Sequence, residues 1–311
     1  MVKSYLHFFL KLSFLCVLLI FADFIIGGIL GHYYFKMAKG EKFSTTYSME
    51  KTEAEILIFG SSRGTHHYVP QVFEQKLKLS CFNVGRDGNF IFYHYAILKS
   101  ILKRYKPKMI ILDIVDSEFI KDDQSYDRIS NLLPYYDRHP EIHSIVELRG
   151  KYERLKLFSK IYPFNSLFLS ILNGNIQEKQ NILEYKGYVP LFRVNDNPLK
   201  ESGEILKYEL DTNKLNVYNS FIQECMTANV DLYIVSSPYF VKFRSRDFSI
   251  AKASSLAKQF GVKFMDLTND SYFLSKPSLF SDPAHLNNDG SKIFSEIISS
   301  RILEDRIQIS Q

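Results

Sequence analysis

Short apolar runs alternate with helical patterns along most of the chain. The continuous apolar runs cover residues 54–59, 81–84, 109–114, 230–235 and 262–267. These runs are rich in β-branched and aromatic residues and show little polar alternation, which is typical of strands covered on both faces. Helical patterns cover residues 91–105, 215–228, 249–260 and 289–303. The alternation predicts an α/β fold of three layers, α/β/α, in which helices cover both faces of a five-stranded, mostly parallel sheet.

The apolar stretch at the N-terminus is longer than any of these runs. Residues 12–31 are interrupted only by Ser13 and Asp23. A helix of about 20 residues rises roughly 30 Å, which is the thickness of a hydrocarbon core. The stretch exceeds the apolar region of a signal peptide, and no small-residue cleavage site follows it. We therefore expect residues 1–31 to form a short cytoplasmic stub and an uncleaved transmembrane helix, with a signal peptide as the alternative.

Charge around this helix leaves two questions open. Lysines lie on both sides of the apolar stretch, so the distribution of positive charge does not fix its orientation. An acidic residue inside a span is costly, and it either serves a function or faces a partner helix. The sequence does not decide between these two interpretations of Asp23.

The remaining segments complete the predicted organisation. Residues 32–53 are polar and lack a clear period, so we expect a stalk between the membrane and the domain. The domain covers residues 54–305, and residues 306–311 form a tail. Residues 117–208 depart from the strand-helix alternation and predict a partly helical insertion after the third strand, because long loops without structure are uncommon. The insertion is either a lid or acceptor-binding surface, or a packing or membrane-facing elaboration.

Composition narrows the classes of function. A chain of 311 residues with 46% hydrophobic and 23% charged content can bury one substantial core. Its net charge of +5 is not concentrated in a basic run, so nucleic-acid binding is not expected. The three cysteines lack the spacing of metal ligands, and we expect buried thiols, although a disulfide between Cys81 and Cys225 stays open. No cofactor is predicted.

Polar residues follow the predicted strands where an open parallel sheet binds its ligands. Ser62 lies in the turn after the first strand, and Asp282 and His285 form an Asp-x-x-His sequence before the last helix. Serine, histidine and aspartate supply a nucleophile, a general base and an orienting carboxylate for acyl chemistry. Because the carboxyl ends of parallel strands share one edge, we expect Ser62 and His285 to meet there.

Two other interpretations of these residues are weaker. Residues 60–64 spell G-x-S-x-G, the nucleophile turn of α/β-hydrolases, but in that fold the acid lies well ahead of the histidine. Here Asp282 precedes His285 by only three residues. His66 and His67 follow the serine turn, yet adjacent residues diverge and no carboxylate lies at a ligand spacing. No metal site is therefore predicted.

Three blocks resemble those of the SGNH (GDSL) hydrolase superfamily, over roughly residues 54–305 without the insertion. Its Gly-Asp-Ser motif corresponds to residues 60–62, with Ser61 in place of Asp. The resemblance implies a flavodoxin-like fold and a catalytic triad of Ser62, His285 and Asp282.

The second block of that family, Asn-x-Gly-x-x-Gly, is matched by residues 83–88. The resemblance implies that the backbone N–H groups of Ser62 and Gly88 form an oxyanion hole.

One block departs from the family pattern. Where the family has Gly-x-Asn-Asp, residues 113–116 read Asp-Ile-Val-Asp, so Val115 replaces a side-chain donor to the oxyanion. Loss of one such donor typically costs about 100- to 1000-fold in rate. Arg63, Arg86 and Asn89 are candidate replacement donors and substrate contacts, and a surface salt bridge is the alternative role of the arginines.

The residues also resemble a membrane-anchored branch of the superfamily, which includes proteins that move D-alanyl or acetyl groups onto cell-envelope polymers. This implies a serine esterase or O-acyltransferase that acts on acyl esters, above all acetyl esters, of cell-envelope polysaccharide. Its expected partners are the envelope glycan and the membrane, with the domain outside the cytoplasm, in the periplasm or at the cell surface. The alternative is a catalytically weak SGNH-like scaffold for a membrane O-acyltransferase, which Val115 and the insertion favour.

Overall fold

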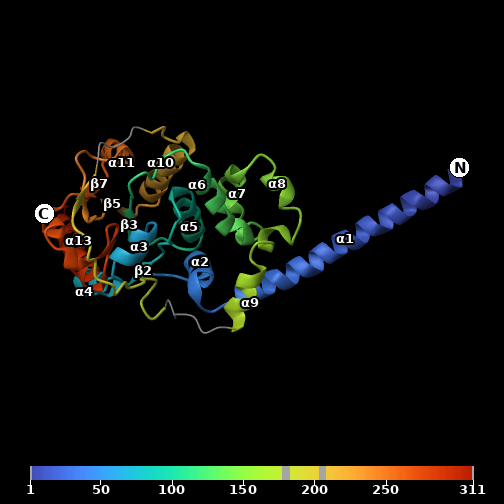
Figure 1. Cartoon of the computed structure of the whole chain (residues 1–311), viewed down its shortest axis with the longest axis horizontal. Helices are drawn as coiled ribbons and strands as arrows, with labels where there is room; N and C mark the ends of the chain where they lie inside the picture. The colour runs from blue at the N-terminus through green and yellow to red at the C-terminus, as the bar shows by residue number, and fades with distance from the viewer. Residues whose placement is uncertain (1, 177–182, 203–207, 310–311) are drawn as a thin grey trace. The chain divides into compact units, whose positions relative to one another are not determined.

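The computed structural model describes the backbone of residues 2–176, 183–202 and 208–309 (Figure 1). The chain divides into two compact units. Residues 1–43 and 129–180 form the first, which we call the helical unit. Residues 44–128 and 181–311 form the second, the sheet unit. The two sequence motifs predicted to carry acyl chemistry, around Ser62 and around His285, both belong to the sheet unit.

A five-stranded parallel sheet forms the centre of the sheet unit, as the apolar runs predict. Its strands are β1 (Ile56–Phe59), β2 (Cys81–Asn83), β3 (Met109–Asp113), β5 (Asp231–Ser236) and β7 (Lys263–Asp266). They lie in the order β2-β1-β3-β5-β7, and every pair is parallel. The chain therefore reverses its direction of strand addition between β1 and β3, where open sheets bind ligands.

Helices cover both faces of this sheet. On one face, Ile56 and Ile58 share an apolar cluster with α4 (Pro70–Leu77) and α13 (Asn288–Ile309). On the other, Phe59 packs against Phe221 of α10 (Thr212–Thr227), with ring centroids 5.4 Å apart, and α10 packs on α5 (Ile91–Arg104). Alternate residues of a strand point to opposite faces, and both faces are apolar here. This is the physical reason that β1 reads as a continuous apolar run.

Further elements lie around the central sheet. The helix α11 (Phe248–Gln259) begins at the cap Asp247, whose carboxylate accepts from the backbone N–H groups of Ser249 and Ile250. Two short pairs of strands were not predicted. They are the parallel pair β4 (Lys200–Glu201) and β6 (Val241–Lys242), and the antiparallel pair β8 (Phe280–Asp282) and β9 (His285–Leu286).

The predicted insertion, residues 117–208, contains several short helices in its described part. They are α6 (Asp123–Arg128), η1 (Ile129–Tyr135), η2 (Pro140–Ile142), α7 (His143–Val146), η3 (Glu147–Arg149), α8 (Glu153–Lys156), η4 (Tyr162–Phe164) and α9 (Phe168–Ile176). Residues 177–182 and 203–207 lie outside the described residues. The stretch is divided between the two units, because residues 129–180 belong to the helical unit together with the N-terminal helix.

The N-terminal helix α1 (Val2–Lys36) is longer than the predicted span. It is the one described helix that is long and apolar enough to cross a membrane, by length and composition, and a signal sequence passes the same test. The Asp23 carboxylate accepts hydrogen bonds within the helical unit. It accepts from the Ser159 hydroxyl at 2.6 Å and from the backbone N–H groups of Lys160 and Ile161 at 2.6 and 3.2 Å.

The stalk predicted for residues 32–53 is largely helical. Its first residues continue α1, and α2 (Gly40–Glu50) follows. Within the sheet unit, the Thr45 hydroxyl lies 2.9 Å from that of Tyr93, and Arg104 Nε donates to the Met49 carbonyl at 2.8 Å. Residues 44–53 are therefore part of the folded unit and not a free linker.

The cysteines carry no disulfide. Cys81 and Cys225 are buried free thiols, as expected, whereas Cys16 lies exposed on α1.

Candidate functional site

The serine turn depends on a glycine at the end of β1. Gly60 has φ +152°, and a Cβ atom there would lie 2.9 Å from Asp113 Cβ and 2.9 Å from Gly64 Cα. Any other residue would be strained and would collide with β3. The tight turn makes Ser62 the first residue of the short helix α3 (Ser62–His67), at the carboxyl end of the sheet.

The histidine is positioned by a turn between β8 and β9. Asp282 Oδ1 accepts from the backbone N–H groups of Ala284 at 2.8 Å and His285 at 3.0 Å. Aspartate side chains commonly stabilise turns in this way. The same carboxylate therefore shapes the turn and lies beside the imidazole that the turn presents.

The structure brings Ser62, His285 and Asp282 together. His285 Nε2 lies 2.8 Å from Ser62 Oγ, and Nδ1 lies 3.0 Å from both carboxylate oxygens of Asp282. Ser62 and His285 are 223 positions apart in the sequence. The side chain of His285 is 24% exposed and that of Asp282 is 44% exposed, so the imidazole is reachable from solvent. Such an arrangement can activate a serine hydroxyl as a nucleophile.

His67 fixes the chain just after His285. The backbone N–H of Leu286 donates to His67 Nε2 at 3.0 Å, so the ring proton lies on Nδ1, which donates to Ser237 Oγ at 2.9 Å. Burial, followed by the positive charge of Arg63, holds the pKa of His67 well below its usual range, so the ring is neutral. No local pattern in the sequence indicates this role, because the partners lie on distant segments.

The pKa of His66 shifts in the opposite direction. Its Nδ1 lies 2.7 Å from the Val189 carbonyl, and its Nε2 lies 3.0 Å from the Asp87 carboxylate. Burial alone would lower the pKa of His66, but the hydrogen bond and charge of Asp87 outweigh it and raise the pKa. The ring lies edge-on to that of His285, with centroids 5.7 Å apart. The sequence did not indicate that Asp87 would raise the pKa of a ring beside His285.

The second block packs against the serine turn. Asn83 Nδ2 donates to the Gly64 carbonyl at 2.8 Å, and the backbone N–H of Arg86 donates to the Gly60 carbonyl at 3.0 Å. Gly88 is in the left-handed region, with φ +65°, and the Arg128 guanidinium carbon lies 3.5 Å from where its Cβ would be. Arg128 was missed at the sequence level, since it falls in the predicted insertion.

Residues 113–116, the block that departs from the family pattern, take part in a buried network of charged groups. Asp113 accepts from Arg63 Nη2 at 3.4 Å and from the Tyr68 hydroxyl at 2.5 Å. Burial raises the pKa of Asp113, and the Arg63 charge opposes that rise. The Asp116 carboxylate is bound by the Tyr239 hydroxyl.

The positions of the three candidate substrate contacts do not support that role. Arg63 is fully buried, because it pairs with Asp113 and stacks on the Tyr239 ring at 3.8 Å. Arg86 is buried and donates to the Thr45 hydroxyl. Asn89 is also buried, and its Nδ2 donates to the Asp87 carbonyl at 2.9 Å. The alternative role of the two arginines, a surface salt bridge, is also wrong, because both side chains are buried.

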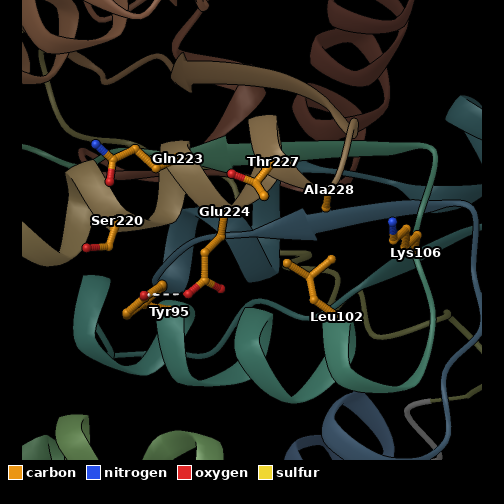
Figure 2. A pocket seen from close by; sticks show the side chains of 8 residues that line it. All are labelled: Tyr95, Leu102, Lys106, Ser220, Gln223, Glu224, Thr227 and Ala228. Carbon is orange, nitrogen blue, oxygen red and sulfur yellow. Dashed lines mark hydrogen bonds between the residues drawn. The ribbon is translucent and has the colours of Figure 1, made fainter.

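A separate cleft lies between α5 and α10 (Figure 2). It has a volume of about 480 Å³, and across it the Tyr95 hydroxyl donates to Glu224 at 2.7 Å. Its lining includes Lys106, just after α5, and Thr227 and Ala228, at the end of α10. Helices that follow parallel strands end at the amino edge of the sheet. The cleft therefore lies at the edge opposite Ser62.

No protein-family model matches the chain, and no curated protein matches it. Comparison with known proteins therefore does not assign the chain to a family. The fold and the site define a class in structural terms only: an α/β protein with hydrogen-bonded serine, histidine and aspartate side chains at the carboxyl edge of a parallel sheet.

Proposed function

We propose that the chain is a membrane-anchored serine esterase or O-acyltransferase of the SGNH type, acting on acyl esters of cell-envelope polysaccharide. The observation that carries this proposal is the 2.8 Å separation of Ser62 Oγ and His285 Nε2, with Asp282 at 3.0 Å on the other side of the ring. A serine hydroxyl held this way has its proton acceptor already in place.

In the proposed reaction, Ser62 Oγ attacks the ester carbonyl carbon while its proton passes to His285 Nε2. Asp282 keeps the other ring proton on Nδ1 and stabilises the imidazolium. As the tetrahedral intermediate collapses, His285 returns the proton to the leaving alcohol, and an acyl-serine remains. Water or a sugar hydroxyl then attacks the acyl-serine and gives up its proton to His285. As this second intermediate collapses, His285 returns the proton to Ser62 Oγ, and the carboxylic acid or the new sugar ester leaves, which completes an esterase or a transferase cycle.

The oxyanion of the intermediate needs hydrogen-bond donors, and residues 113–116 do not supply one through Val115. In our proposal the backbone N–H groups of Ser62 and Gly88 donate to it. The guanidinium of Arg128 beside Gly88 adds positive charge near that place, which offsets the absence of a donor at Val115.

The strand order supports the SGNH assignment. When the five strands of the central sheet are numbered among themselves, their order is 2-1-3-4-5. This is the flavodoxin-like order, in which ligands bind at the reversal between the first and third strands. Ser62 follows the first of these strands.

The packing of α1 supports an anchor that is retained. A Cβ atom at Gly27 would lie 2.4 Å from the Lys160 backbone, so the second half of α1 fits closely against the rest of the helical unit. A cleaved signal sequence has no reason to be built into the folded unit that it leaves. An enzyme tethered in this way is suited to a polymer of the cell envelope, and we place its domain outside the cytoplasm.

The scaffold hypothesis remains the second candidate, because Val115 donates nothing and the Asp116 carboxylate is bound to Tyr239. A fluorophosphonate probe on the full chain in detergent separates the two. The enzyme hypothesis predicts labelling of the parent and of Ser61→Ala, a matched change one residue away, and no labelling of Ser62→Ala. Equal labelling of parent and Ser62→Ala would favour the scaffold.

Hydrolysis of p-nitrophenyl acetate by the same three proteins gives the rate that accompanies labelling. Acetyl release from native envelope glycan, with and without an added sugar acceptor, then distinguishes hydrolysis from transfer.

A further inference from the structure

We propose that residues 149–160 of the helical unit, the interfacial segment, insert apolar side chains into the surface of the lipid bilayer beside α1. The segment contains α8, which Figure 1 shows in light green. The inference rests on the proposed anchoring of α1 and adds a second contact with the same membrane. The interfacial segment contacts the headgroup region of a bilayer that contains anionic lipid.

The interfacial segment exposes large apolar side chains at regular spacing. Tyr152 is 60% exposed, Leu155 is 64% exposed and Phe158 is 74% exposed. Residues three apart lie on the same side of a helical turn. A group of exposed apolar side chains is unfavourable in water and typically marks an interaction surface.

The attachment of this segment to α1 places it at the depth of a membrane surface. Ser159, Lys160 and Ile161, which directly follow Phe158, are the residues that donate to Asp23. A span that starts after Lys11 needs about 20 residues, and so ends near the end of the apolar stretch. Asp23 then lies about 12 Å, or eight residues, inside that end. Amphipathic segments bury their apolar faces about 5–10 Å deep, so the contact with Asp23 holds the end of the interfacial segment slightly below that depth.

This placement also explains the acidic residue in the apolar helix. A carboxylate at membrane depth must find donors within the protein. Asp23 finds two of them at the end of the interfacial segment and a third in Ile161, the next residue. Gly27, one turn further along α1, allows the Lys160 backbone to approach. The same unit holds a cleft of about 310 Å³ between α1 and the insertion, with Phe24, Leu157 and Phe164 in its lining.

The charge of the segment selects the kind of lipid. Residues 149–160 contain five basic residues and one acidic residue, Glu153. Lys151 and Arg154 directly precede two of the exposed apolar residues, Tyr152 and Leu155. Basic and aromatic residues in alternation are typical of segments that lie on an anionic membrane surface, where each basic residue adds about 1 kcal/mol.

The test uses the full chain in vesicles of phosphatidylcholine with and without phosphatidylglycerol, and lipids that carry a nitroxide quencher. An environment-sensitive fluorophore is attached at one cysteine at a time. The native Cys16 reports on α1, and Phe158→Cys and Met226→Cys, each with Cys16→Ser, report on the interfacial segment and on a half-exposed residue of α10. Cys81 and Cys225 are buried and stay unlabelled.

We expect the lipid quencher to remove more than about half of the fluorescence at Cys16 and at Phe158→Cys, because both lie within the bilayer or its interface. Met226→Cys should instead be quenched by iodide in the water. Quenching at Phe158→Cys should increase with phosphatidylglycerol and lose that increase when Lys151 and Arg154 are both changed to Glu.

Two different failures are distinguishable. If Cys16 is not quenched by lipid, α1 is not in the bilayer, and both the anchoring and the interfacial segment are wrong. If Cys16 is quenched and Phe158→Cys behaves like Met226→Cys, the anchor stands and the interfacial segment is overturned.

Discussion

The charge of Asp282 can be removed while its turn is kept. In Asp282→Asn, the amide oxygen still accepts from the backbone N–H groups of Ala284 and His285, which the carboxylate binds at 2.8 and 3.0 Å. The amide nitrogen then faces His285 Nδ1 as a donor, so the ring takes the tautomer with its proton on Nε2. In that tautomer Nε2 points a proton at Ser62 Oγ and cannot accept one.

The size of the effect follows from the exposure of the carboxylate. The same change at a buried acid in a Ser-His-Asp triad costs about 10⁴-fold in turnover. Asp282 is 44% exposed, so water replaces part of the lost stabilisation of the imidazolium. We therefore expect a loss of about 10³-fold in kcat/KM, which is about 4 kcal/mol of transition-state stabilisation.

The assay is hydrolysis of p-nitrophenyl acetate by the full chain in detergent, together with the rate of fluorophosphonate labelling. Asp270→Asn is the matched control, because Asp270 accepts from the backbone N–H groups of Tyr272 and Phe273 in a similar turn but contacts no catalytic candidate. Unfolding followed by circular dichroism should be nearly unchanged in both variants. Activity of Asp282→Asn within tenfold of the parent, with Ser62→Ala inactive, would refute the role given to this carboxylate.

Three further predictions concern stability, measured by urea unfolding of the full chain in detergent. Gly60→Ala should lower the free energy of unfolding by more than about 2 kcal/mol, because it adds steric collisions to backbone strain. Gly261→Ala, with φ +69° and open space around it, should lower it by only about 1 kcal/mol. Equal losses would contradict the close packing at Gly60. Arg63→Leu should lower the free energy of unfolding by about 3–5 kcal/mol, because it leaves the buried Asp113 charge unpaired. Adding Asp113→Asn should recover part of that loss. No recovery would argue against the ion pair between Arg63 and Asp113. Burial lowers the pKa of His94 from 6.5 to about 3, so between these values only the unfolded chain binds the proton, and stability falls by about 2 kcal/mol from pH 7 to pH 5. His94→Gln should lose that part of the pH dependence, and an unchanged slope would count against a neutral buried ring.

The central sheet was predictable because its strands are buried on both faces. Each of the five apolar runs became a strand of the sheet, since a short continuous apolar run with β-branched residues has few other stable environments. The helix at residues 40–50 was not predictable. Its buried side includes Thr45 and Ser48, and these polar side chains are buried only because partners such as Tyr93 come from distant elements.

The candidate site was predictable in its residues and not in its surroundings. The serine turn and the Asp-x-x-His sequence are local patterns, so Ser62, Asp282 and His285 could be named directly. Arg63 follows two serines in the sequence and is typical of an exposed turn, but Asp113 and Tyr239 from two other segments enclose it. Long-range partners of this kind decide burial, and a local pattern carries no information about them.

The separation of Ser62 from His285 is fixed by more than their own contact. The helix α3, which begins at Ser62, ends at His67, and His67 accepts from the backbone of Leu286, the residue after His285. The helix that follows, α13, is held to the end of α3 by Ser291 Oγ, which donates to the His66 carbonyl at 2.7 Å. The segments that carry the nucleophile and the base are therefore joined at two places that follow His285, so the geometry does not depend on the exposed turn alone. A catalytic site needs preorganisation of this kind, and a chance contact lacks it. For this reason we favour the enzyme hypothesis over the scaffold hypothesis.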